Sequence, residues 1–130
     1  MIHKNSFSKS EHLCGEKRIT RLYTKGDAFI AYPLRVVFLI EPKIEDESAY
    51  VLVSVPKKRF KRAVKRNRLK RIMREAYRLN KHLIIEKLVD KNLQLHISFN
   101  YVSDDVLEFE AIEKKMKIAL QKLIDKIELV

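Results

Sequence analysis

The sequence predicts an α+β fold, a two-layer sandwich in which helices cover a small sheet. Hydrophobic residues make up 46% of the 130 residues, which is enough for a buried core. The chain contains 2 Gly and 3 Pro, a composition that disfavours an all-β sandwich with many tight turns. Segments with strand-like and helix-like spacing also alternate. The length suits one domain, expected to span residues 1–130.

The N-terminal half is expected to hold one helix followed by strands. Residues 16–24 have helical spacing, and Gly26 is a plausible helix stop. The apolar side of this helix holds Ile19, Leu22 and Tyr23. The β-branched and aromatic residues of 28–40 predict a strand. Residues 41–48 are acidic and turn-like, and 49–55 predict a second strand.

The C-terminal half is expected to hold two main helices and one strand. A basic helix begins near residues 62–65 and continues at least to Leu79, with a helical continuation over 82–87. Residues 93–99 alternate strictly, which predicts a strand with one buried face. Residues 108–127 form an amphipathic helix. Its apolar stripe is Ile112, Met116, Ala119, Leu120, Leu123 and Ile127. The expected order is therefore α-β-β-α-β-α.

The positive charge of the chain is concentrated in one segment. Between Lys57 and Arg78 lie twelve of the 28 Lys and Arg residues but one of the 17 acids, Glu75. This segment alone therefore accounts for the net charge of +11, and the rest of the chain is balanced. Because concentrated charge repels itself, this pattern indicates a polyanionic partner.

At 100° per residue, the basic helix has two distinct faces. The face expected to pack on the sheet holds Leu69, Ile72, Met73, Ala76 and Tyr77. The other face holds Asn67, Lys70, Arg71, Arg74 and Arg78. A solvated face would need acids at i±4 to relieve repulsion, and the segment offers Glu75 alone. Nucleic acid is therefore favoured over water as the partner, since arginine suits bidentate phosphate contacts and base stacking.

The candidate nucleic-acid contacts are the twelve cations and one amide. They are Lys57, Lys58, Arg59, Lys61, Arg62, Lys65, Arg66, Asn67, Arg68, Lys70, Arg71, Arg74 and Arg78. The amide of Asn67 can read a base edge or simply form a local hydrogen bond. Charge alone leaves RNA and DNA open. A DNA-binding helix-turn-helix is disfavoured, because strands rather than a nearby helix are expected to flank the basic helix.

No group of residues predicts catalysis by the chain itself. The acids of 45–47 and 104–110 lie in turn-like or helix-start sequence, where caps and solvated surface are expected rather than Mg²⁺ ligands. No histidine is spaced to pair with another or with Cys14, which is expected to be a small half-buried residue. Residues 1–6 lack the apolar stretch of a signal peptide, and no membrane span is visible. A cytoplasmic location is expected.

The basic segment resembles a known family signature. Residues 65–76 read Lys-Arg-Asn-Arg-Leu-Lys-Arg-Ile-Met-Arg-Glu-Ala, which is similar to the Arg-Asn-Arg signature of bacterial ribonuclease P proteins. A strand ending in a small residue and two lysines precedes that signature in the family, here residues 54–58 with Pro56 where many relatives have serine. The N-terminal pattern also matches, with Phe7, Leu13, Ile19, Tyr23, Lys25-Gly26 and residues 33–37. The resemblance covers most of the chain.

The resemblance implies a function as well as a fold. Family members share an α/β sandwich with a left-handed βαβ crossover that carries the signature helix. The subunit binds ribonuclease P RNA and the 5′ leader of precursor transfer RNA, while the RNA and its Mg²⁺ ions carry out hydrolysis. No catalytic residue or metal site is therefore expected in this chain. No membrane association is expected, and the sequence identifies no protein partner. The alternative is a structural RNA-binding protein of ribosomal type, which would not require an apolar cleft.

The resemblance also implies a leader-binding cleft between the sheet and flanking helices. Its residues would be Ile19, Tyr23, Arg35, Val37, Leu39 and Ser54. Strand periodicity agrees in placing Arg35, Val37 and Leu39 on one face. Family members commonly have aromatic residues at the positions of Ile19 and Val37, so Tyr23 is expected to provide more of the stacking here. A plain core role for Tyr23 and Val37 stays open.

Overall fold

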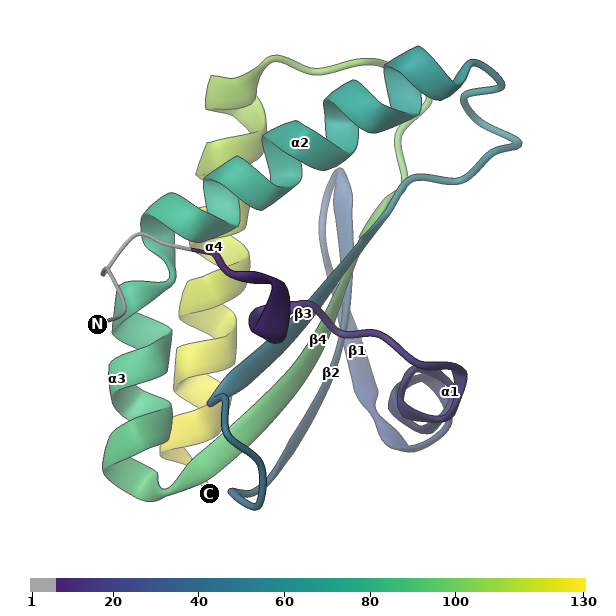
Figure 1. The fold of residues 1–130 in the computed structure, drawn as a ribbon. Coiled ribbons are helices and arrows are strands. Elements are labelled where there is room, and N and C mark those ends of the chain that lie inside the picture. The colour runs from purple at the N-terminus through teal and green to yellow at the C-terminus, as the bar shows by residue number, and fades with distance from the viewer. Residues whose placement is uncertain (1–6) are drawn as a thin grey trace.

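A computed structural model describes residues 7–130 and contains one four-stranded sheet with the order β1-β2-β4-β3. The expectation about residues 1–6 lies outside the described part. In chain order (Figure 1), the elements are a 3₁₀ helix η1 (Lys9–Glu11), α1 (Glu16–Lys25), β1 (Asp27–Ala31), β2 (Leu34–Pro42), β3 (Ala49–Ser54), α2 (Ala63–Asn80), α3 (His82–Lys91), β4 (Leu93–Tyr101) and α4 (Phe109–Glu128).

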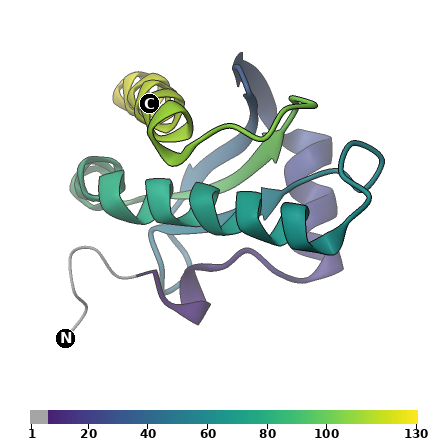
Figure 2. The ribbon, with the colours of Figure 1, turned by 90° about the horizontal axis from the view of Figure 1, so that it is seen from above.

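Helices lie on both sides of the sheet, with α2, α3 and α4 on one face and α1 on the other (Figures 1 and 2). The larger core cluster joins the sheet to α2, α3 and α4 and includes Leu34, Val36 and Phe38 of β2. A smaller cluster beneath α1 contains Leu13, Leu22, Val37 and Tyr50. The predicted α+β class is thus confirmed.

The element order differs from the prediction by one strand and one helix. Residues 28–40 do not form one strand but a hairpin, in which β1 pairs antiparallel with β2 around Tyr32 and Pro33. Pro33 in the turn is the sequence signal for this break, but the apolar residues on both sides of it favoured one continuous strand. The expected continuation over 82–87 is a separate helix, α3. The observed order is α-β-β-β-α-α-β-α.

Both faces of β4 are buried, so the prediction of one buried face for residues 93–99 was wrong. The alternation is real, but β4 lies between β2 and β3, and other segments cover its polar side. This polar side is satisfied in part, since Gln94 Nε2 and both ring nitrogens of His96 have no hydrogen-bond partner among the described residues, whereas the oxygen of Gln94 has two. Gln94 Oε1 accepts hydrogen bonds at 3.1 Å from the backbone N–H groups of Ile44 and Glu45.

The strands β3 and β4 are parallel neighbours, and α2 and α3 connect them. This connection is the βαβ crossover that the family resemblance implied; its left-handed sense stays a prediction. Ser54 is the last residue of β3, so the loop that leads to α2 begins at that end of the sheet.

Gly26 ends α1, as predicted, for a steric reason. Its N–H donates to the carbonyl of Leu22 at 2.8 Å. A Cβ atom at this position would lie 2.5 Å from Leu22 O and 2.6 Å from Phe38 O. Glycine therefore permits the close approach of the end of α1 to β2.

A buried ion pair ties the N-terminal segment to the junction of α2 and α3. Lys81 Nζ lies 2.8 Å from both carboxylate oxygens of Glu11. The side chains are 5% and 10% exposed, respectively. Two residues further on, Leu13 N–H donates to Val51 O at 2.8 Å, so the same segment lies along β3.

Loss of one member of this pair should destabilise the fold strongly. Glu11→Ala leaves the Lys81 ammonium buried without its partner and should cost about 3–5 kcal/mol of unfolding free energy. Glu128→Ala is the control, because Glu128 pairs with Lys87 at 3.4 Å on the surface and should cost at most about 1 kcal/mol. Urea unfolding measures both. Equal, small losses would contradict this role of the pair.

Candidate nucleic-acid interface

The apolar face of α2 holds the helix against the rest of the protein. Leu69, Met73, Ala76 and Tyr77 are buried and Ile72 is partly buried, which confirms the predicted inner face. A polar contact adds to this packing. Asn80 Nδ2 donates to Glu113 Oε2 on α4 at 3.0 Å. Because the inner face is held in this way, the opposite face of α2 points away from the core.

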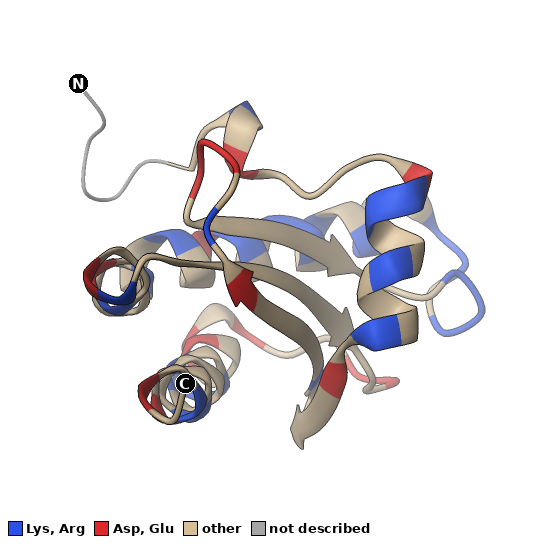
Figure 3. Cartoon of the chain, turned by 90° about the horizontal axis from the view of Figure 1, so that it is seen from below, with Lys and Arg blue, Asp and Glu red and all other residues tan. Residues whose placement is uncertain are grey.

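The loop 57–62 and the outward side of α2 form what we call the basic surface; Figure 3 marks the lysines and arginines in blue. Most of the predicted contacts are exposed there. Within residues 7–130 these cations have no ion pair: Lys57, Lys58, Lys61, Arg62, Lys65, Arg68, Arg71 and Arg74. Asn67 is also exposed, and Lys70 is half-buried.

The helix dipole adds to this positive potential. The N-cap of α2, Arg62, makes no side-chain capping hydrogen bond, and the first turn contains no acid. The backbone N–H groups at a helix N-terminus carry partial positive charge. This end of α2 thus combines backbone and side-chain charge of the same sign, an arrangement that phosphate groups stabilise.

Three of the predicted contacts also have partners within the protein. Arg59 Nη1 lies 2.8 Å from Asp104 Oδ1, and Arg78 pairs with Glu75 one turn earlier in α2. Arg66 Nη1 donates to the carbonyls of Phe60 and Lys61. Of these, sequence spacing could have indicated the Arg78 pair alone, since Asp104 is distant and carbonyl partners leave no trace in a sequence.

The sheet face on the side of α1 has a covered part and an open part. Val37 is 3% exposed and packs with Leu22 of α1, while Ile19 and Leu39 are partly buried against the same cluster. For Val37, the structure thus supports the core role that the sequence left open. Val37 aligns with Ser98 of β4, and Arg35 and Ser54 both align with Asn100, two residues further along β4. Arg35 and Ser54 therefore lie nearer the open end of this face.

Tyr23 is 43% exposed at the edge of this open part. Its hydroxyl donates to Asn100 Oδ1 at 2.9 Å and lies 2.5 Å from Ser98 Oγ. Asn100 Nδ2 in turn donates to the backbone carbonyl of Arg35 at 3.2 Å. These bonds fix the Tyr23 ring beside β4. Ser98 and Asn100 were not among the predicted site residues, although the polar positions of the alternating strand could have indicated them.

Beneath α1 lies a closed polar patch. His96 is fully buried, with Nδ1 3.9 Å from Glu41 Oε1 and its ring against Tyr50. Burial lowers the pKa of His96, so the ring is neutral near pH 7. Arg21 pairs with Glu41, and Arg18 with Glu45. These two ion pairs join α1 to β2 and to the turn that follows it, and so hold α1 over the patch.

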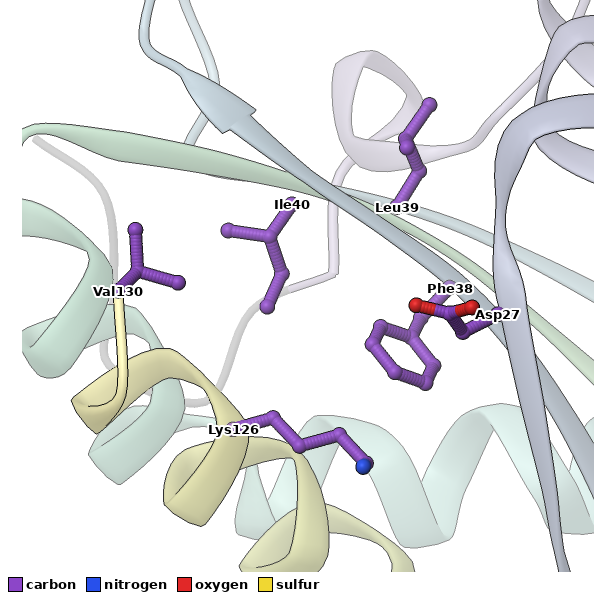
Figure 4. Close-up of a pocket in the computed structure, with 6 residues that line it drawn as sticks. All are labelled: Asp27, Phe38, Leu39, Ile40, Lys126 and Val130. Carbon is purple, nitrogen blue, oxygen red and sulfur yellow. The ribbon is translucent and has the colours of Figure 1, made fainter.

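A pocket of about 310 Å³ lies on the other side of the sheet, between α4 and β2 (Figure 4). Lys126 reaches over the ring of Phe38 there, 5.7 Å from its centroid. The lining residues are Asp27, Phe38, Leu39, Ile40, Lys126 and Val130. They include no histidine, cysteine or serine that could act as a nucleophile or base.

Two further expectations need correction. Cys14 is exposed rather than half-buried, because it precedes α1 outside both core clusters. The basic helix is also not flanked by strands alone, since α3 follows α2 directly. A DNA-binding helix-turn-helix is disfavoured instead because α3, the helix next to α2, carries acids as well as cations.

Within residues 7–130, no group of three or more His, Cys, Asp or Glu residues is arranged to hold a metal ion. In the same part of the chain, no helix has the length and hydropathy needed to cross a membrane.

Comparisons with known proteins agree with one another. A family model described as Ribonuclease P matches residues 7–124. The ribonuclease P protein component of Porphyromonas gingivalis is 45% identical over 116 residues, covering 89% of this chain and 85% of that protein. The component of Chlorobaculum tepidum is 28% identical, covering 92% and 84%. The solved Staphylococcus aureus RNase P protein has the same fold, with a TM-score of 0.65, 21% identity and coverage of 88% and 96%.

Proposed function

The chain belongs to the ribonuclease P protein family, and we propose that it binds ribonuclease P RNA and the 5′ leader of precursor transfer RNA. In this proposal it acts in the cytoplasm as the subunit that supports endonucleolytic removal of the leader. The RNA subunit and its Mg²⁺ ions carry out the hydrolysis, and the protein alone is inactive. The observation that supports RNA binding most strongly is the row of exposed cations on the basic surface, eight of which have no ion pair within residues 7–130.

The basic surface suits a folded RNA because its cations are held at fixed positions along the loop and α2. Its helix is fixed by buried side chains, so the cations keep their spacing without a partner. Exposed arginines such as Arg68 and Arg71 can each contact a phosphate through two N–H groups. Structured RNA offers closely spaced phosphates to match them.

The open part of the sheet face suits a single strand. Tyr23 offers a fixed aromatic ring with an exposed side, and Arg35 adds an exposed cation. Ser54 ends β3, three residues before Lys57 of the basic surface. A leader could therefore pass from the basic loop to Tyr23, with stacked bases and neutralised phosphates. Val37 of β2 and Ile19 of α1 would hold the helix against the sheet rather than contact the leader.

A structural RNA-binding protein of ribosomal type remains the second candidate, because it would share the basic surface. The exposed ring of Tyr23 favours the ribonuclease P function, since a generic RNA-binding protein does not require a fixed aromatic side chain opposite its basic helix.

Binding to the RNA subunit should depend steeply on salt. Arg68→Ala and Arg71→Ala each remove one phosphate contact, so each should flatten the log–log dependence of affinity on salt by roughly 0.7 to 0.9. Filter binding at several KCl concentrations measures this slope. Lys122→Ala is the control, because Lys122 lies over Phe29 of β1 and should leave the slope unchanged. A large drop in melting temperature with unchanged affinity would make Arg68 and Arg71 structural residues.

Tyr23 should distinguish precursor from mature transfer RNA. A stacked base contributes about 1–3 kcal/mol, so Tyr23→Ala should weaken binding of the precursor to the holoenzyme on the order of tenfold and leave mature transfer RNA unaffected. Tyr23→Phe keeps the ring and should lose less. Melting curves establish that both variants fold. Equal losses for the two ligands in a folded Tyr23→Ala protein would refute the leader path.

A further inference from the structure

The loop between β3 and α2 is fixed to the rest of the protein. The Phe60 side chain is 5% exposed and its ring lies 5.9 Å from that of Tyr101. The backbone N–H groups of Arg59 and Phe60 both donate to Pro56 O at 3.2 Å, which closes a turn. The ion pair of Arg59 with Asp104 holds the loop to the segment that follows β4.

Arg66 supplies the contact between this loop and α2. Its Nη1 donates to Phe60 O at 2.7 Å and to Lys61 O at 2.8 Å. The side chain thus points back from the first turn of α2 across the loop. It is half-buried, whereas its neighbours Lys65 and Arg68 are exposed.

The loop needs such a contact because its own side chains repel one another. Lys57, Lys58, Lys61 and Arg62 lie within six residues, and no ion pair joins any of them to an acid in the described part of the chain. A free loop would spread these charges apart, and RNA binding would then have to order it at a cost in free energy. A loop already ordered in the free protein avoids that cost.

We propose that Arg66 is a positioning residue for RNA binding, one that orders the loop cations through the carbonyls of Phe60 and Lys61 rather than by contacting phosphate itself. The inference rests on the proposed RNA binding and assigns to Arg66 a role different from that of Arg68. Arginine suits this role because it stays charged and directs several N–H groups from one rigid plane.

A mutant cycle on binding to ribonuclease P RNA tests the proposal. If Arg66 acts through the loop, Arg66→Ala weakens binding several-fold in the otherwise unchanged protein. It then has almost no further effect when Lys57, Lys58 and Lys61 are already alanine, because coupled residues are not additive. Arg68→Ala is the control and should weaken binding by the same factor in both backgrounds. An equal loss for Arg66→Ala in both backgrounds would overturn the proposal.

Amide hydrogen exchange of the free protein gives a readout without RNA. Arg66→Ala should speed exchange at Arg59 and Phe60 several-fold, while Arg68→Ala leaves it as in the unchanged protein. Unchanged exchange in Arg66→Ala would overturn the positioning role even if RNA binding were confirmed. If Arg68→Ala and the loop variant both bind as tightly as the unchanged protein, the proposed function fails instead.

Arg66→Lys serves as the second variant, in case Arg66→Ala unfolds. Because the lysine ammonium also has N–H donors, this variant is read beside Arg66→Met, which keeps a long side chain and has no donor. Arg66→Met should exchange faster than the unchanged protein at Arg59 and Phe60 and bind RNA less tightly than Arg66→Lys. Slow exchange and full affinity in Arg66→Met would overturn the proposal.

Discussion

The packing of the inner face of α2 is the interaction on which the rest of the structure depends. Leu69, Met73, Ala76 and Tyr77 are buried against the core, and each large side chain of this kind contributes about 1.5–3 kcal/mol. That burial offsets the repulsion among the exposed cations on the opposite side of the same helix. Without this burial, α2 could rotate or detach, and its cations would no longer lie together on one exposed side. On α2, the direction of the row of cations is therefore a consequence of this apolar contact.

The sheet topology connects this row to the second part of the candidate site. Because β3 is parallel to β4 and leads directly into the loop before α2, the basic loop begins beside the open end of the sheet face. The same face displays Tyr23, held by Ser98 and Asn100, and is closed further along by α1 over Val37. A surface for folded RNA and a path for a single strand thus meet at one end of the sheet.

Local periodicity predicted much of this from sequence. The two faces of α2, the stripe of α4 and the end of α1 at Gly26 follow from spacing and from single residues. The hairpin around Pro33 and the second buried face of β4 did not, because both depend on which segments become neighbours. The same holds for the site: exposure of Arg68 or Arg71 follows from the helix pattern, whereas the inward contacts of Arg59 and Arg66 depend on Asp104 and on backbone carbonyls.

The most direct test of the central claim is reconstitution. The purified protein is combined with the ribonuclease P RNA and a precursor transfer RNA of its own organism at low Mg²⁺, and release of the 5′ leader is followed over time. The account predicts correct cleavage when protein and RNA are both present and none with the protein alone. Cleavage by RNA-free protein, or a rate with RNA that does not change when the protein is added, would contradict it.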